Sequence, residues 1–139
     1  MTRPIKFRAW NKKDKEMIVG FPLDALRQNR SFIDVSPYGN SGGGVIEIKE
    51  VKNIIVMQFT GLLDKNGKEI YEHDILMFEK KGKQVRKDYW VVSWSEKGKW
   101  VMERLGTRQS LWSNDGAGGN HAKNHEVVGN IYENPNLIQ

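Results

Sequence analysis

Apolar and polar residues alternate along most of the chain, with the period of two that β-strands show when their two faces meet different surroundings. Ile5–Trp10 alternates apolar with basic residues and Met17–Val19 follows after a polar turn, so these two segments predict a hairpin. Val45–Val51 alternates in the same way, and the more apolar Ile54–Phe59 predicts a second, more buried strand. Period two dominates, so we expect a mostly β protein.

The turn signals indicate antiparallel pairing of the other strands. Asn66-Gly67 is the strongest short hairpin signal, because both central positions need a positive φ, and it predicts that Phe59–Leu63 turns back along Glu69–Tyr71. Further strands are predicted at Asp74–Glu79, at Asp88–Trp94 with its partner Trp100–Leu105, and at Val127–Tyr132. Only Leu23–Asn29 and a C-terminal turn opened by Pro135 have helical character, and both are too short for a parallel crossover.

Composition narrows the possible classes of function. The chain has 139 residues and no cysteine, which excludes disulfide scaffolds, cysteine zinc sites, iron–sulfur clusters and thiol nucleophiles. The longest apolar runs are Ile54–Met57 and Tyr89–Val92, far shorter than the roughly 18 residues of a membrane-spanning helix. The N-terminus has no apolar signal-peptide segment. We therefore expect a cytoplasmic protein with no membrane partner.

Positive charge is concentrated in one segment. The net charge is +5, from 22 basic and 17 acidic residues, and five of the eight residues in Lys80–Lys87 are basic while none is acidic. The basic residues are Lys80, Lys81, Lys83, Arg86 and Lys87. The segment is either a solvated hairpin tip around Gly82, with lysines that protect strand edges, or a contact for a polyanion.

Aromatic residues are the second unusual feature. There are five tryptophans, and four of them fall between Trp90 and Trp112. In one interpretation these indoles form the core of a small barrel, because aromatic side chains bury large apolar areas. In the other, an exposed indole beside Lys80–Lys87 stacks on bases of single-stranded nucleic acid. We favour the core and expect Tyr89 or Trp112 to be the exposed exception.

Two motifs match known chemistry only in part. Ser41 lies in a G-x-S-x-G match within the glycine-rich segment 38–44, but the strand before and the helix after that support a nucleophile elbow are missing. His121 and His125 are four residues apart, which on a helix would allow joint metal ligation. The glycine-rich residues before them disfavour a helix, so we predict a polar loop and no metal site.

The remaining acid–base candidates have simpler explanations. His73 and Asp74 are neighbours, and neighbours on a strand point to opposite faces, so we interpret His73 as a turn residue near positive φ. Glu69, Glu72 and Asp74 are predicted to be solvated strand residues, because charged side chains usually face water. We therefore predict no catalytic residue.

Three blocks of the chain resemble the YopX family of small phage and prophage proteins. They are IKFRAW at residues 5–10, QFTGLLDKNGKEIYE at 58–72 and GNIYENP at 129–135. The resemblance implies an N-terminal β subdomain over residues 1–60 and an SH3-like small barrel over 61–139. It supplies no catalytic residues, and it implies that self-association is plausible. Where the family usually has glycine before an Asp-Ile pair, this chain has His73.

These observations favour a non-enzymatic phage or prophage accessory protein, a β-rich binding or assembly module without a small-molecule cofactor. Exposed strand edges favour self-association into a homo-oligomer. The alternative is a module that binds DNA or RNA through the basic hairpin. Its contacts would be Lys80, Lys81, Lys83, Arg86 and Lys87, with help from Arg3, Lys6 and Arg8. A third hypothesis is an enzyme that uses the loop with His121 and His125.

Overall fold

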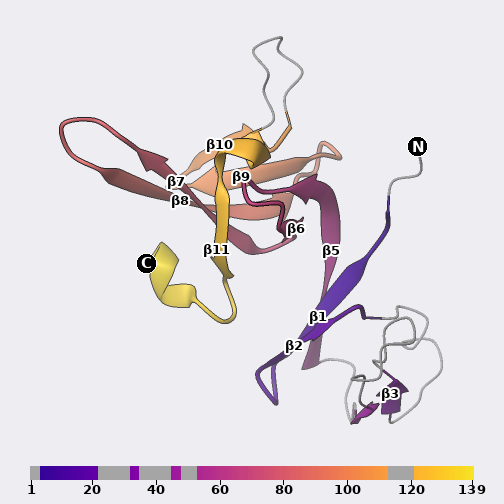
Figure 1. Ribbon diagram of the computed structural model, residues 1–139. Helices are drawn as coiled ribbons and strands as arrows, with labels where there is room; N and C mark the ends of the chain where they lie inside the picture. The colour runs from indigo at the N-terminus through magenta and orange to yellow at the C-terminus, as the bar shows by residue number, and fades with distance from the viewer. Residues whose placement is uncertain (1–3, 22–31, 35–44, 48–52, 113–120) are drawn as a thin grey trace. The chain divides into compact units, whose positions relative to one another are not determined.

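The computed structural model describes residues 4–21, 32–34, 45–47, 53–112 and 121–139, and in these segments the strands pair in antiparallel sheets (Figure 1). The mostly β, antiparallel fold class is thus confirmed. The chain divides into two compact units, residues 1–58 and 59–139, close to the boundary at residue 60 that the family resemblance implies. The SH3-like form of the second unit stays a prediction.

The first unit is built around strand β1. β1 (Phe7–Asn11) pairs with β2 (Glu16–Val19) on one side and with the first half of β5 (Ile54–Leu63) on the other. A separate pair is formed by β3 (Phe32–Asp34) and β4 (Val45–Glu47). The predicted first hairpin is confirmed, but Ile5 lies outside it and is exposed.

The second unit contains the other half of β5, one five-stranded sheet and two short 3-10 helices. β5 pairs with β6 (Glu69–Tyr71), so the predicted return across Asn66-Gly67 is confirmed. The sheet has the order β10-β9-β8-β7-β11. Its strands are β7 (Asp74–Lys80), β8 (Arg86–Trp94), β9 (Trp100–Arg104), β10 (Thr107–Ser110) and β11 (Glu126–Asn130). The 3-10 helices are η3 (His121–Asn124) and η4 (Pro135–Ile138).

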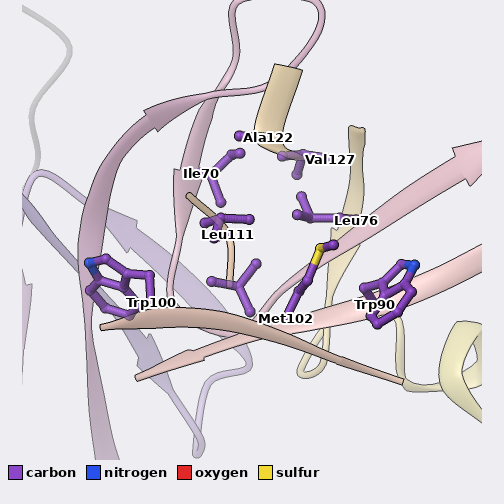
Figure 2. Close-up of a cluster of buried hydrophobic side chains, with 9 residues drawn as sticks. Ile70, Leu76, Trp90, Trp100, Met102, Leu111, Ala122 and Val127 are labelled. Carbon is purple, nitrogen blue, oxygen red and sulfur yellow. The ribbon is translucent and has the colours of Figure 1, made fainter. Parts of the chain in front are cut away.

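The core of the second unit lies against one face of this sheet (Figure 2). It joins Leu76 of β7 and alternating side chains of β8 and β9 with side chains from β6, η3 and β11 and with Leu111, which follows β10. The cluster consists of Ile70, Leu76, Trp90, Val92, Trp100, Met102, Leu111, Ala122 and Val127. Because successive strand residues point to opposite faces, the alternation in β8 sends Trp90 and Val92 inward and leaves Tyr89 and Val91 on the other face.

A buried carboxylate closes the turn between β5 and β6. Asp64 accepts hydrogen bonds from the backbone N–H groups of Asn66 and Lys68, each at 2.8 Å, while Gly67 adopts a φ of 80°. Its second oxygen accepts the N–H of Val127 in β11 at 2.9 Å. The carboxylate therefore fastens this turn to the edge strand of the sheet. The Asn66-Gly67 signal predicts this turn, but no pattern in the sequence indicates the role of Asp64.

Several predicted elements differ in extent. β4 ends at Glu47, and residues 48–51 of the strand predicted there lie outside the described residues, as does the helical segment 23–29. β10 was not predicted, because its sequence TRQS has no apolar alternation; it pairs with β9 from Thr107↔Arg104 to Ser110↔Val101. The turn opened by Pro135 is confirmed as η4. None of the helices in the described segments is long and apolar enough to cross a membrane.

Candidate nucleic-acid interface

The basic segment forms the outer end of the β7–β8 hairpin. The ladder runs from Ile75↔Val91 to Lys80↔Arg86, and every residue in Lys80–Lys87 is exposed. Figure 1 shows the two strands extending beyond the other strands of the second unit before they turn. We call Lys80–Lys87 the basic tip. We call the segments Asp74–Phe78 and Asp88–Val92, which pair from Ile75↔Val91 to Phe78↔Asp88, the hairpin root. The structure thus places all five predicted basic residues on one exposed loop and its first ladder pairs.

An ion-pair cluster marks the border between root and tip. Arg86 Nη2 donates a hydrogen bond to Oδ2 of Asp88 at 3.1 Å. The Nε of Arg86 and the Nη2 of Arg104 form ion pairs with Oδ1 of Asp88, each at 3.0 Å. The hydrogen bond from Arg86 lowers the pKa of Asp88, the charge of Arg104 lowers it further, and burial opposes both. Arg86 is therefore held by Asp88, and the charge the tip presents to a partner rests on its four lysines.

Not all of the N-terminal basic residues that were expected to assist the basic tip are exposed. The structure leaves Lys6 exposed, and Arg3 lies outside the described residues. Arg8 is buried, with its Nη2 3.8 Å from the Sδ of Met57, a weak contact inside the first unit. The expectation that Arg8 contacts a polyanion is wrong. The alternation in Ile5–Trp10 predicted that the basic residues lie on a solvent-exposed face of the strand, whereas Arg8 on that face is buried.

The tryptophans separate into core and exposed residues. Trp90 and Trp100 are buried in the core, which confirms the core interpretation for them. Trp94 is 53% exposed and Trp112 is 52% exposed. Trp94 ends β8 and packs edge-on against Trp100 with ring centroids 4.9 Å apart, so it lies at the end of the strand opposite the basic tip. The aromatic residue nearest the lysines along β8 is therefore Tyr89, not an indole.

His73 and Asp74, the neighbouring acid–base candidates, stabilise the turn between β6 and β7. His73 has a φ of 67°, which confirms the predicted positive φ. Its Nδ1 lies 2.9 Å from the hydroxyl of Tyr132. Asp74 is only 1% exposed and accepts the N–H of Tyr71 at 2.8 Å, so the prediction of a solvated Asp74 is wrong. Its carboxylate caps the turn that precedes β7.

The histidine pair lies in and after η3, which corrects the prediction of a loop without helical structure at this point. The Nδ1–H of His125 donates to the carbonyl oxygen of His121 at 2.6 Å, and the ring lies against that of Phe78 with centroids 5.2 Å apart. Burial lowers the pKa of His125, although the hydrogen bond to His121 opposes this shift. Within the described segments, no three His, Asp or Glu side chains are grouped to hold a metal ion. Ser41 lies outside them.

The comparisons with known proteins agree with an antiparallel β protein of this size. The family model described as YopX protein matches residues 6–139, so the chain belongs to the YopX family. A solved structure, protein EF1440 from Enterococcus faecalis, is similar with a TM-score of 0.66 and 26% sequence identity. The similarity covers 99% of this chain and all of that one. No curated protein matches.

Proposed function

We propose that this YopX protein is a non-enzymatic binding or assembly module of a phage or prophage, acting in the cytoplasm of the bacterial host. The family membership supports the phage context. The positive observation behind a non-enzymatic role is that the buried chemically capable groups maintain the fold. Asp64 and Asp74 accept backbone N–H groups, Asp88 is paired with arginines, and His125 is bonded to a backbone carbonyl.

Self-association belongs to this proposal. The five-stranded sheet ends at β10, where Thr107, Arg108 and Gln109 are exposed. An edge strand carries backbone donors and acceptors that a second copy could pair with. Light scattering on the purified protein measures this directly. A mass above that of one chain supports the assembly role, and a monomer at every concentration contradicts it.

The non-enzymatic role is tested by hydrolase and transferase screens on the purified protein, with metal analysis of the same sample. We expect no turnover. An activity that is abolished by replacing one polar residue, such as His125→Gln, while the protein stays folded would overturn the proposal. A stoichiometric metal ion would instead favour the third hypothesis, in which His121 and His125 take part.

The basic tip supports a second, more specific function, which is binding of DNA or RNA. Lys80, Lys81, Lys83 and Lys87 lie within one exposed loop and its ladder ends, so their charges sum at a phosphate backbone instead of being spread over the surface. Neutralised phosphates release counterions, so the logarithm of the affinity falls with the logarithm of salt concentration by about 0.9 per contact on duplex DNA. This electrostatic contribution to the affinity needs no base-specific contacts.

The test compares two variants with the same change in charge. In the first, Lys81, Lys83 and Lys87 become Ser; in the second, the exposed Lys97, Lys99 and Lys123 become Ser. The first variant should lose about two to three units of salt slope between about 50 and 200 mM salt, and the second should keep most of it. Equal losses in both would show that only net charge matters. Absence of binding by the unaltered protein at low salt would remove this function.

A further inference from the structure

A pocket with a volume of about 330 Å³ opens on the outer face of strands β8 and β9, the face opposite the core. Its lining consists of Lys87, Tyr89, Val91, Glu103, Arg104, Leu105, Leu137, Ile138 and Gln139. Helix η4 supplies Leu137 and Ile138, and Figure 1 shows this helix beside the hairpin. The volume is at the lower end of the roughly 300–1,000 Å³ of small-molecule sites. Apolar and aromatic walls with a few charged groups are also typical of such sites.

The pocket is continuous with the basic tip. Lys87 belongs to both, because it is exposed at the tip and also lines the pocket. Tyr89 follows two residues later on β8, so it points to the same face. A flexible anionic chain whose phosphates follow the tip lysines would therefore pass the pocket beside an aromatic ring.

Leu105 gives an independent sign that this surface contacts a partner. It begins the turn between β9 and β10 with a φ of 48°, and Gly106 follows at 80°. Asparagine or glycine suits such a position, and other side chains are strained there. Leu105 is also 88% exposed. An apolar side chain that adds strain and buries almost nothing has no reason in the fold itself, which favours a role in binding.

We propose that this pocket takes one unstacked base of a single-stranded nucleic acid, stacked on Tyr89 beside Leu105 and Ile138, with the adjoining phosphates on Lys87 and the tip. This proposal rests on the nucleic-acid function above. A base in a duplex cannot enter, since both of its faces are covered by neighbouring base pairs. The pocket therefore specifies the single-stranded form, which the lysines alone do not.

The charged groups of the pocket are held in defined positions. Glu103 accepts a hydrogen bond from the hydroxyl of Ser93 at 3.2 Å and pairs with Arg108 at 2.9 Å. Arg104 is positioned by Asp88. A fixed carboxylate can accept from the amino group of a base, and a fixed guanidinium can contact its phosphate. These side chains supply polar contacts at the rim, while Tyr89 supplies the stacking surface.

The experiment measures the affinity of a labelled mixed-sequence single strand and of the same strand annealed to its complement, at one low salt concentration. The unaltered protein should prefer the single strand. Tyr89→Leu should weaken single-strand binding by roughly 5- to 150-fold, the range that corresponds to one base stacked on an aromatic ring, and leave duplex binding unchanged. Tyr89→Phe keeps the ring and should retain the affinity for the single strand.

A second variant separates binding from folding. Leu105→Asn suits the positive φ, so it should raise the thermal midpoint of unfolding while it weakens single-strand binding. A purely structural role for Leu105 would leave binding unchanged, which contradicts the proposal. If the unaltered protein binds neither strand, the nucleic-acid function itself fails. If it binds both equally and Tyr89→Leu changes nothing, only the pocket proposal fails.

Discussion

The root and the tip of the β7–β8 hairpin belong to the same two strands, but the root is buried in the core and the tip is exposed to solvent. At the root, Leu76 pairs with Trp90 and both are buried in the core. At the tip, Lys80 pairs with Arg86 and both are exposed. The backbone ladder is continuous between them, so the difference comes from what lies against each face. The root supports folding and the tip is available for a partner.

The β8–β9 turn sharpens this contrast, because it also carries a Gly-Lys pair. In this turn the backbone N–H of Ser95 donates to the carbonyl oxygen of Lys99 at 2.9 Å, and Gly98 has a φ of 75°. Glu96 is close in sequence to Lys97 and Lys99. It is a short turn of mixed charge. The basic tip has no acidic residue from Lys80 to Lys87. Exposed lysines alone therefore do not define a site; the concentration of charge of one sign does.

The largest expected effect is at the root. Trp90→Ala should lower the free energy of unfolding by about 3–5 kcal/mol, because it leaves a cavity in the core. Lys83→Ser at the tip should change it by less than about 0.5 kcal/mol. Urea unfolding monitored by circular dichroism measures both. Comparable losses in the two variants would mean that the tip is part of the folded core.

The next largest effect on stability is expected at Asp88, on the border between the root and the basic tip. Asp88→Asn removes the charge that holds Arg86 and Arg104, and should lower the free energy of unfolding by about 1–2 kcal/mol. It also releases Arg86, so binding to DNA or RNA should become stronger and more salt-dependent. Glu96→Gln makes the same change in charge on the exposed β8–β9 turn and is the control. An equal gain in binding by Glu96→Gln would refute a special role for the border.

A residue packed against the root should also make stability depend on pH: the ring of His125 lies against that of Phe78, which belongs to the root. Burial lowers the pKa of His125 in the folded protein below its ordinary value of about 6.5, so the unfolded chain binds a proton more readily. Stability should therefore be complete above about pH 6.5 and fall as the pH drops below it. His125→Gln should remove this slope, whereas His121→Gln should leave most of it. Unfolding midpoints measured from pH 8 to about pH 5 test this, above the range where Asp88 titrates.

The smallest effect is electrostatic. Replacing Lys81, Lys83 and Lys87 by Ser reduces repulsion among like charges, so the free energy of unfolding should rise by a few tenths of a kcal/mol at low salt. The gain should disappear near 1 M salt, where the Debye length is about 3 Å. Thermal melts at the two salt concentrations show the difference. A large loss of stability would instead assign these lysines to the fold.

Much of the local structure was predictable because it depends on neighbouring residues. The positive φ of His73 and the turn at Asn66-Gly67 follow from local conformational preferences. The pairing of β8 with β9 follows from two alternating segments separated by a short turn. β10 was missed because a polar edge strand has no alternation to detect.

The candidate site was predictable in part for the same reason. The concentration of charge in Lys80–Lys87 is a property of the sequence, and so is its place between two strands. That Arg86 and Arg104 both pair with Asp88 was not predictable, because Arg104 comes from the next strand. The pocket beside Tyr89 depends on η4 folding back against β8, which no local pattern indicates.

By itself, the sequence determined the strand periods, the tight turns and the charge of the tip, because each depends on residues a few positions apart. Tertiary structure decided which positions of a face are covered. Trp90 and Trp94 alternate identically on β8, yet Trp90 is buried and Trp94 is half exposed, since Trp94 ends the strand at the margin of the core, where it packs edge-on against Trp100. Periodicity specifies a face, and only packing specifies how far along that face the core extends.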